Sequence, residues 1–351
     1  MTAIIEKDAR LVSRLRAGLL NWYDRHRRDL PWRRGARDSY RVWLSEVMLQ
    51  QTTTVHAAPY YSRFLELWPT VADLAAAPDE QVMAEWAGLG YYSRARNLIK
   101  CARAVVDQHG GHFPANEAEL LKLPGLGAYT AAAVAAIAFD QPANVIDSNI
   151  ERIVARLYAI DTPLPEARSP IRLAAQQWVL PERAGDWPQA LMDLSAAICR
   201  PKAPLCLLCP LQDGCAAFAS GKPELYPVKA AKAVKPQRYG IAFLIVGEDG
   251  FIAERRADKG LLGGMLGIPH TPWRDMQWTA VEADPPLPEF LPVGQYSHVF
   301  THFALEQAVW RREATAAEIA ALLRAHNDWQ LVPFAQEKSL PTVFRKALVF
   351  A

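Results

Sequence analysis

The chain has 351 residues, of which 51% are hydrophobic and 22% are charged, and its formal net charge is +2. The length predicts two or three domains, and the composition supports full-sized cores and excludes an intrinsically disordered chain. The sequence contains no run of about 18 apolar residues, so no transmembrane helix is predicted. The charged N-terminal stretch does not resemble a signal peptide, so we expect a soluble, cytoplasmic protein.

Most of the first 215 residues are expected to be helical, because apolar residues recur every three or four positions. Examples of the predicted helices are residues 40–53, 60–68, 94–108, 117–122, 131–139, 173–179 and 188–198. Strand-like alternation is almost absent before residue 238. Residues 1–220 are therefore predicted to form an all-α domain.

The composition changes at residues 221–238, which are rich in proline and lysine and predict a basic linker. Beyond this linker, apolar runs at 239–246, 251–255 and 303–309 predict strands. Residues 316–325 and 342–350 have helical spacing. The second domain, 239–351, is thus expected to be a smaller α+β fold.

Glu46 is the one carboxylate in the predicted helix over 40–53, which we expect Ser39 to cap. Val42 and Trp43 lie one turn before Glu46 and Leu49 one turn after it, so its surroundings are apolar. Desolvation raises the pKa of such a carboxyl and keeps it protonated, as a general acid requires. A structural glutamate paired with an arginine is an equally good interpretation of the residues alone.

Asp147 directly precedes another predicted helix, where an aspartate usually caps the N-terminus. Ser148 and Glu151 have the spacing of a capping box of their own. We therefore expect Ser148 to cap this helix and Asp147 to be free for another role.

Residues 123–130, LPGLGAYT, join two predicted helices through Gly125 and Gly127. Glycines permit a tight turn and close approach of another group, and the N–H groups of the next helix can hold a phosphate. The pattern predicts a helix–hairpin–helix that contacts the DNA backbone without sequence preference. A simple αα-hairpin is the alternative.

Four of the five cysteines lie within 17 residues, as Cys199, Cys206, Cys209 and Cys215. In a cytoplasmic protein such clustering favours a metal site over disulfides. The spacing can hold a tetrahedral zinc or a four-iron cluster, and the single C-x2-C pair favours the cluster. Cys101 stands alone in a helix and is expected to be a buried thiol.

These motifs resemble the adenine DNA glycosylases of the MutY family, within the endonuclease III superfamily of helix–hairpin–helix glycosylases. The matching segments are 43–52, 88–96, 123–129, 145–149 and the cysteine loop. The resemblance covers residues 10–220 and continues less strictly to the C-terminus. Ser148 departs from it, because the family usually has glycine there.

The resemblance implies a base excision repair enzyme that hydrolyses the N-glycosidic bond of adenine mispaired with 8-oxoguanine or guanine in double-stranded DNA. Glu46 would protonate adenine and Asp147 would stabilise the oxocarbenium-like sugar, with Tyr129 and Asn149 supporting them. Bifunctional members carry lysine where this chain has Tyr129, so a monofunctional glycosylase is implied. The target base must first leave the stack.

Further residue roles follow only from the resemblance. It implies an adenine pocket of Trp32, Arg33 and Asp193. DNA contacts are implied for Gln51, Thr52, Leu89, Tyr91, Gly125 and Gly127. A 4Fe–4S cluster is implied on the four clustered cysteines. For Trp32 and Tyr91 taken singly, ordinary core packing is the alternative.

Residues 239–351 resemble the Nudix-like domain with which this family recognises 8-oxoguanine. The stretch 260–269, which would carry metal-binding glutamates in a Nudix hydrolase, has none, so this domain is expected to bind without hydrolysing. Phe300, Thr301 and His302 match the recognition loop, and Thr301 keeps a hydroxyl donor where the family has serine. A plain β-hairpin with surface histidines is the alternative.

Two other functions stay open from the sequence. One is an endonuclease III-like lyase acting on oxidised pyrimidines, against which Tyr129 and the additional C-terminal domain argue. The other is a catalytically silent DNA-binding or iron–sulfur redox module, against which the joint presence of Glu46 and Asp147 argues. We expect a monomer that works on nucleoid DNA in the cytoplasm.

Overall fold

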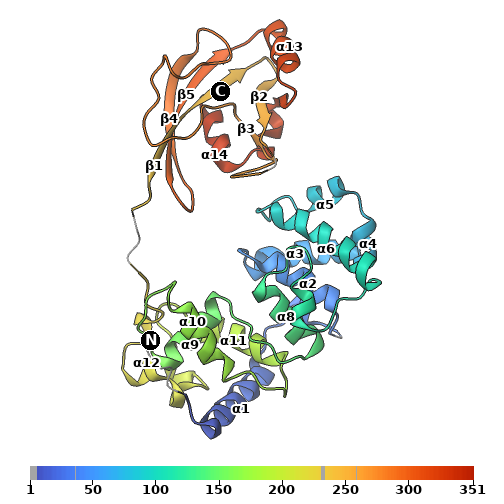
Figure 1. The fold of residues 1–351 in the computed structure, drawn as a ribbon, viewed down its shortest axis with the longest axis vertical. Coiled ribbons are helices and arrows are strands. Elements are labelled where there is room, and N and C mark those ends of the chain that lie inside the picture. The colour runs from blue at the N-terminus through green and yellow to red at the C-terminus, as the bar shows by residue number, and fades with distance from the viewer. Residues whose placement is uncertain (1–5, 36, 231–233, 258) are drawn as a thin grey trace. The chain divides into compact units, whose positions relative to one another are not determined.

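The computed structural model describes residues 6–35, 37–230, 234–257 and 259–351. The chain divides into two compact units, residues 1–231 and 232–351, the first helical and the second built on a sheet (Figure 1). Within the described ranges, no helix combines the length and apolarity needed to span a membrane.

The helical unit contains every helix predicted from the periodicity before residue 200, with shifted ends. Its helices are α1 (Ala9–His26), α2 (Ser39–Leu49), α3 (Thr54–Leu67), α4 (Val71–Ala76), α5 (Asp79–Glu85), α6 (Ser93–His109), α7 (Glu117–Leu120), α8 (Ala128–Phe139), α9 (Ser148–Tyr158), α10 (Arg168–Gln176), α11 (Asp186–Ala197) and α12 (Ala216–Ala219). The expectation that Ser39 caps α2 is wrong. Asp38 is the cap, because its carboxylate reaches the Arg41 amide at 2.8 Å and Ser39 already lies inside the helix.

Helix α2 packs against α8 in this unit. Residues 130–137 of α8 are all buried, and most of them are alanine. Small side chains let two helices approach closely, since the interaxial distance depends on the residues at the contact. Residues 40, 42–48 of α2 are buried as well, so both helices place their side chains at fixed positions in the interior.

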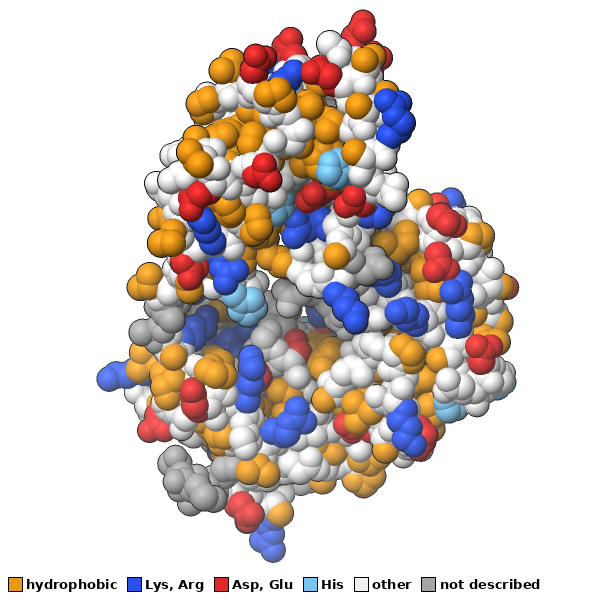
Figure 2. Space-filling model, turned by 45° about the horizontal axis from the view of Figure 1, so that its top comes forward, with side chains coloured by type: hydrophobic (Ala, Val, Ile, Leu, Met, Phe, Trp, Pro, Cys, Tyr) orange, Lys and Arg blue, Asp and Glu red, His pale blue; other side chains and the backbone are white. Residues whose placement is uncertain are grey.

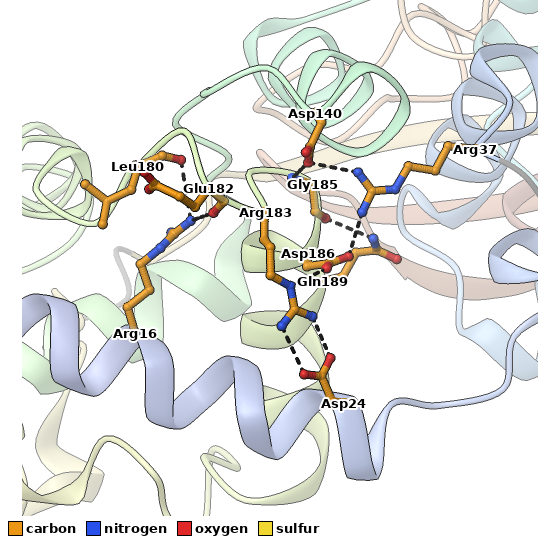
Figure 3. A network of polar contacts seen from close by, with 10 residues as sticks. All are labelled: Arg16, Asp24, Arg37, Asp140, Leu180, Glu182, Arg183, Gly185, Asp186 and Gln189. Atoms are coloured by element: carbon orange, nitrogen blue, oxygen red, sulfur yellow. Dashed lines mark hydrogen bonds and ion pairs between the residues drawn. The ribbon is translucent and has the colours of Figure 1, made fainter.

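A network of arginines and acceptors ties α1 to the loop before α11 (Figure 3). The buried Arg16 donates to the backbone carbonyls of Trp178 at 2.8 Å, of Leu180 and of Glu182. Its guanidinium also lies over the Trp187 ring, 4.9 Å from the centroid. Because three carbonyls depend on one side chain, Arg16 fixes the course of this loop.

The outer part of the same network consists of more exposed ion pairs (Figure 3). Arg183 pairs with Asp24 at 2.5 Å and with Asp186 at 2.8 Å. Arg37, which precedes α2, contacts both Asp140 and Asp186 at 2.8 Å. These pairs connect the start of α2 to the second half of the helical unit.

The sheet unit contains β1 (Gln237–Val246), β2 (Gly250–Arg255), β3 (Leu266–Gly267), β4 (Leu291–Val299), β5 (Ala304–Glu313) and β6 (Trp329–Pro333), with helices α13 (Ala316–Ala325) and α14 (Thr342–Arg345). The strand order is β3-β2-β1-β5-β4, and β6 also pairs with β2. β1 and β5 are parallel, and the other pairs are antiparallel. The predicted strands and the helix over 316–325 are confirmed, whereas the segment 342–350 is α-helical only to Arg345 and continues as a 3₁₀ helix.

The expected linker 221–238 is shorter in the structure. Pro223–Leu225 forms a 3₁₀ turn on the helical unit, and the Leu164 amide donates to the Val228 carbonyl at 2.9 Å. At the other end, Gln237 already belongs to β1. The proline and lysine content therefore located the boundary between the units. It did not predict how many residues of the segment belong to the folded units.

Replacing Arg16 tests how strongly the buried part of the network holds the fold. We expect Arg16→Met to lower the free energy of unfolding of the helical unit by about 3 kcal/mol, because three acceptors lose a charged donor. The matched control, Arg183→Gln, removes exposed pairs and should cost less than about 1 kcal/mol. Urea unfolding followed by tryptophan fluorescence measures both, and equal losses would contradict this account of the network.

Candidate active site

A cleft of about 590 Å³ lies where the end of α2, the start of α8 and the N-terminus of α9 meet. The four predicted catalytic residues share it, together with the predicted DNA contacts Gln51 and Thr52. The complete lining is Glu46, Leu49, Gln50, Gln51, Thr52, Thr53, Tyr129, Asp147, Ser148 and Asn149.

Glu46 is 6% exposed, and the Tyr129 hydroxyl donates to its Oε2 at 2.7 Å. Burial raises the pKa of Glu46 to about 7, with a smaller contribution from the charge of Asp147, while the Tyr129 hydrogen bond acts in the opposite direction. Burial also raises the pKa of Tyr129 well above its ordinary value, so this hydroxyl keeps its proton. In the described residues no arginine or lysine forms an ion pair with Glu46. The arrangement is therefore a carboxyl that can hold and release a proton near neutral pH.

The expectation that Ser148 caps α9 is wrong, because Asp147 is the cap. One carboxylate oxygen, Oδ1, accepts the backbone amides of Asn149 at 3.0 Å and Ile150 at 2.7 Å. The other, Oδ2, accepts the Asn149 side-chain amide at 2.8 Å. Ser148 is already helical and exposed. Asp147 thus caps the helix and still lines the cleft, and the helix N-terminus favours its negative charge.

Arg152 extends this chain of contacts and was not identified from the sequence. Its guanidinium donates to Asn149 Oδ1 at 3.2 Å and to the carbonyl of Cys199 at 2.9 Å. Arg156, one turn later, donates to Cys199 Sγ at 3.3 Å. The sequence signal for these contacts was a pair of arginines four residues apart on the buried face of one helix. A buried guanidinium needs buried acceptors, so such a pair indicates polar contacts in the interior. Helix α9 therefore contacts the cleft at its N-terminus and the cysteine loop along its length.

The cysteine loop runs from the end of α11 to α12 and brings its four thiols into one region. Burial, with smaller contributions from the charges of Cys199, Cys206 and Cys215, raises the pKa of Cys209 to about 12. Among the described residues, no three His, Cys, Asp or Glu side chains converge closely enough to hold a single metal ion. Four cysteine thiolates are the donor set that binds a four-iron cluster, so the chemistry of these residues fits such a group.

A narrow crevice of about 50 Å³ continues from Glu46 past the predicted adenine-pocket residues Trp32 and Arg33. Asp193 does not line it. This carboxylate is 1% exposed and accepts from Arg28 at 2.6 Å and from Arg33 at 2.7 Å, so it orients two arginines that do line the crevice. Trp32 is half-buried and packs edge-on against Tyr61.

Two of the predicted DNA contacts lie on exposed turns in a strained backbone conformation. Gln51 has φ 58° and Tyr91 has φ 48°, a region that side-chain-bearing residues rarely occupy. Tyr91 is 63% exposed, so core packing does not explain it, whereas Leu89 is buried. Such strain persists where the surroundings impose it and is concentrated at functional sites.

Arg94 is the group that fixes both turns, and it too was missed. This buried side chain donates to the carbonyls of Val47 and Met48 at the end of α2 and to those of Leu89 and Gly90. The last carbonyls of α2 have no partner within the helix and are free to accept from Arg94. Because the same guanidinium also donates to the carbonyls of Leu89 and Gly90, it joins the two turns.

The predicted hairpin joins α7 to α8. Gly125 has φ 78°, and a Cβ there would lie 2.6 Å from the Cβ of Asn97. Gly127 caps α8 with an ordinary φ, and a Cβ there would have no neighbour within 4 Å. Gly125 is therefore required by the turn, while the exposed Gly127 leaves the first amides of α8 open to another molecule.

In the sheet unit, Phe300, Thr301 and His302 form the turn between β4 and β5. Phe300 packs against Phe303 and Trp273, with ring centroids 4.7 and 5.3 Å away. Thr301 and His302 are exposed at the tip. The segment is a β-hairpin turn with an anchored aromatic residue and two free polar ones.

The surface has no single basic block on the face shown in Figure 2, where lysine and arginine side chains alternate with acidic and apolar ones. This distribution agrees with the net charge of +2.

The chain is similar in sequence to known DNA repair proteins. Residues 44–179 match the model of the HhH-GPD superfamily base excision DNA repair protein. The adenine DNA glycosylase of Mus musculus is 35% identical over 363 residues, covering 85% of this chain and 70% of the mouse protein. That of Buchnera aphidicola subsp. Schizaphis graminum is 31% identical over 296 residues, covering 82% and 84%.

Solved structures agree on the fold of the helical unit. A thermostable thymine-DNA glycosylase superposes with a TM-score of 0.55 and 30% identity, over 61% of this chain and 100% of that one. An endonuclease III in a non-covalent DNA complex superposes with a TM-score of 0.50 and 23% identity, over 62% and 99%, which bears on the fold alone. The chain is thus a DNA glycosylase of base excision repair, and it belongs to the adenine DNA glycosylases of the MutY family.

Proposed function

We propose that this enzyme removes adenine mispaired with 8-oxoguanine or guanine from duplex DNA, by hydrolysis and without lyase activity. The observation that carries the chemistry is the presence in one cleft of two carboxyl groups in different environments. Glu46 is buried and has a raised pKa, whereas Asp147 is held at a helix N-terminus. Such a pair divides the work of cleaving a glycosidic bond between a proton donor and a stabilising negative charge.

In the proposed reaction, the Glu46 carboxyl donates its proton to a ring nitrogen of adenine. The bond between C1′ and N9 then breaks with its electron pair on N9, and adenine leaves as a neutral base. The Asp147 carboxylate stabilises the positive charge that develops on the sugar. Water adds to C1′, and its proton returns to Glu46, which restores the enzyme.

Tyr129 limits the reaction to hydrolysis. A lyase requires an amine that attacks C1′ and forms a Schiff base, and a phenol cannot do so. Here the Tyr129 hydroxyl donates to Glu46 and keeps that carboxyl in one orientation. The residue therefore serves the proton donor instead of acting as a nucleophile.

We propose that Cys199, Cys206, Cys209 and Cys215 hold a 4Fe–4S cluster. When bound, the cluster would brace the loop between α11 and α12, and the proposed hydrolysis transfers no electrons through it. Arg156 and Arg152 lie between this loop and the cleft, with contacts to Cys199 on one side and, from Arg152, to Asn149 on the other. The role assigned to the loop is to hold α9, and with it Asp147, in place.

We propose that the sheet unit is a Nudix-like domain that recognises the base opposite adenine through the turn at 300–302. 8-Oxoguanine differs from guanine by an oxygen at C8 and a hydrogen at N7. A side chain must therefore reach that edge of the base to distinguish the two. Thr301 offers a free hydroxyl at an exposed tip, and the packing of Phe300 holds the tip in position.

The role of Glu46 predicts the pH dependence of excision. Because the proton donor must be protonated, the single-turnover rate should fall as the pH rises through the Glu46 pKa of about 7. Tyr129→Phe removes a hydrogen bond that favours the ionised form, so it should move this decline to higher pH. Glu46→Gln should abolish excision and retain DNA binding.

The matched control is Tyr60→Phe, which removes an exposed hydroxyl that donates to the Ala87 carbonyl. Its pH profile should equal that of the wild type. A Tyr129→Phe profile displaced to lower pH, or a Glu46→Gln variant with more than a few per cent of wild-type excision, would contradict the assigned roles.

The cysteine loop predicts an iron content of roughly four atoms per chain, with the yellow-brown colour of a cluster. Cys209→Ser should lose iron and lower the stability of the helical unit. Cys101→Ser is the control, since this thiol is buried in α6 away from the loop and should leave the iron content unchanged. Elemental analysis decides, and stoichiometric zinc without iron would overturn the assignment.

The proposed substrate is tested by single-turnover excision from matched duplexes with adenine opposite 8-oxoguanine or guanine. We expect faster excision opposite 8-oxoguanine. Thr301→Ala should reduce that advantage by about tenfold, within the ~1–3 kcal/mol of one base-edge contact. Thr301→Ser keeps the hydroxyl and should behave as the wild type. Equal rates on both duplexes would remove the recognition role of the turn.

A further inference from the structure

The crevice beside Glu46 has a second end that does not open into the cleft. It shares Glu46 and Leu49 with the cleft. At its other end it meets a third cavity of about 610 Å³, here called the rear cavity, which has no lining residue in common with the cleft. The crevice and the rear cavity share Arg28, Trp32, Arg33, Val42, Ile137 and Gln189. Cleft, crevice and rear cavity are therefore arranged in series.

The rear cavity reaches solvent. Exposed side chains line it in the segment between α1 and α2, namely Arg27, Asp29, Arg34, Arg37 and Asp38. Its inner wall is formed by buried residues of α2, α8 and α11, including Val42, Ile137 and Gln189. A molecule in the crevice thus has a route to water that bypasses the cleft.

Trp32 is the side chain most able to control this route. The crevice, at about 50 Å³, has room for only a few water molecules, so a purine passes only if a side chain moves. Val42, Ile137 and Gln189 lie in helices, and Gln189 is held by its bond to the Gly185 carbonyl at 2.9 Å. Trp32 instead lies on the short 3₁₀ turn Pro31–Arg33 and is half-buried.

The charges of the rear cavity suit a neutral aromatic molecule better than a phosphate. Most of its arginines are paired with carboxylates, as Arg34 is with Asp29 at 2.6 Å and Arg37 is with Asp186 at 2.8 Å. Arg28 and Arg33 share Asp193. Paired guanidiniums attract a polyanion little but still stack on a flat heteroaromatic ring.

We propose that the excised adenine leaves through the rear cavity, past Trp32, while the abasic DNA still covers the cleft. This inference rests on the proposed function, because it takes the crevice as the site of the extruded base. The base is neutral after the bond has broken, so it carries no charge through the constriction. The rear cavity is then an exit site for a free purine.

The experiment separates cleavage of the bond from departure of the base. A duplex with radiolabelled adenine opposite 8-oxoguanine is mixed with excess enzyme. Hot alkali measures cleaved sites at each time, and rapid filtration through a membrane that retains protein and DNA measures the free base. The double variant Arg27→Trp, Arg34→Trp narrows the mouth of the rear cavity, and both single variants are measured with it. Arg25→Trp adds the same bulk on α1 outside the cavity lining and is the matched control.

In the wild type and in Arg25→Trp, the free base should appear as fast as the cleaved sites and before the DNA dissociates. In the double variant, cleavage should stay within about twofold of the wild type, while release of the base slows by about tenfold. Release that keeps pace with cleavage in the double and single variants overturns the rear exit, as does a wild type that releases base only when its DNA dissociates. A wild type that cleaves no labelled adenine overturns the proposed function itself, and the exit with it.

Discussion

The hydrogen bond from the Tyr129 hydroxyl to the buried Glu46 is the contact on which the geometry of the candidate site depends. It joins α2 to α8 in the interior, where small side chains let the two helices pack closely. A carboxyl in this place is costly when ionised, and one hydroxyl donor offsets only part of that cost. The raised pKa of Glu46 is the result, and it makes the residue useful for proton transfer instead of merely structural.

Helix α9 relates the rest of the helical unit to this pair. Its N-terminus presents Asp147 and Asn149 to the cleft, and its buried arginines contact the cysteine loop. A displacement of the cysteine loop would therefore move Asp147 directly, because helix α9 connects the two as a rigid element. Arg94 plays a similar part for the exposed turns at residues 51 and 91, because its buried guanidinium donates to backbone carbonyls beside both turns.

The periodic parts of the fold were predictable from the sequence, and the parts set by tertiary contacts were not. The helices and β1 have strong apolar patterns. By contrast, β4 was missed because it contains proline and glycine and most of its residues are exposed. Several of the cleft residues were named through motifs and the family resemblance, but Arg152 was not, because its role follows from acceptors in α11 and in the cysteine loop. The caps at Ser39 and Ser148 were misassigned by one residue, since serine and aspartate have similar preferences at that position.

The helix cap formed by Asp147 restricts which residue types can replace it. Oδ1 is occupied by two backbone amides and Oδ2 by the amide of Asn149, so both oxygens must act as acceptors. Asparagine offers one acceptor and would set its own N–H₂ group against that of Asn149 or against the helix amides. Serine caps a helix but has a single oxygen on a shorter side chain. By count of acceptors and by reach, neither asparagine nor serine satisfies the helix and the cleft together, so two substitutions tolerated at other helix caps are not equivalent to aspartate here.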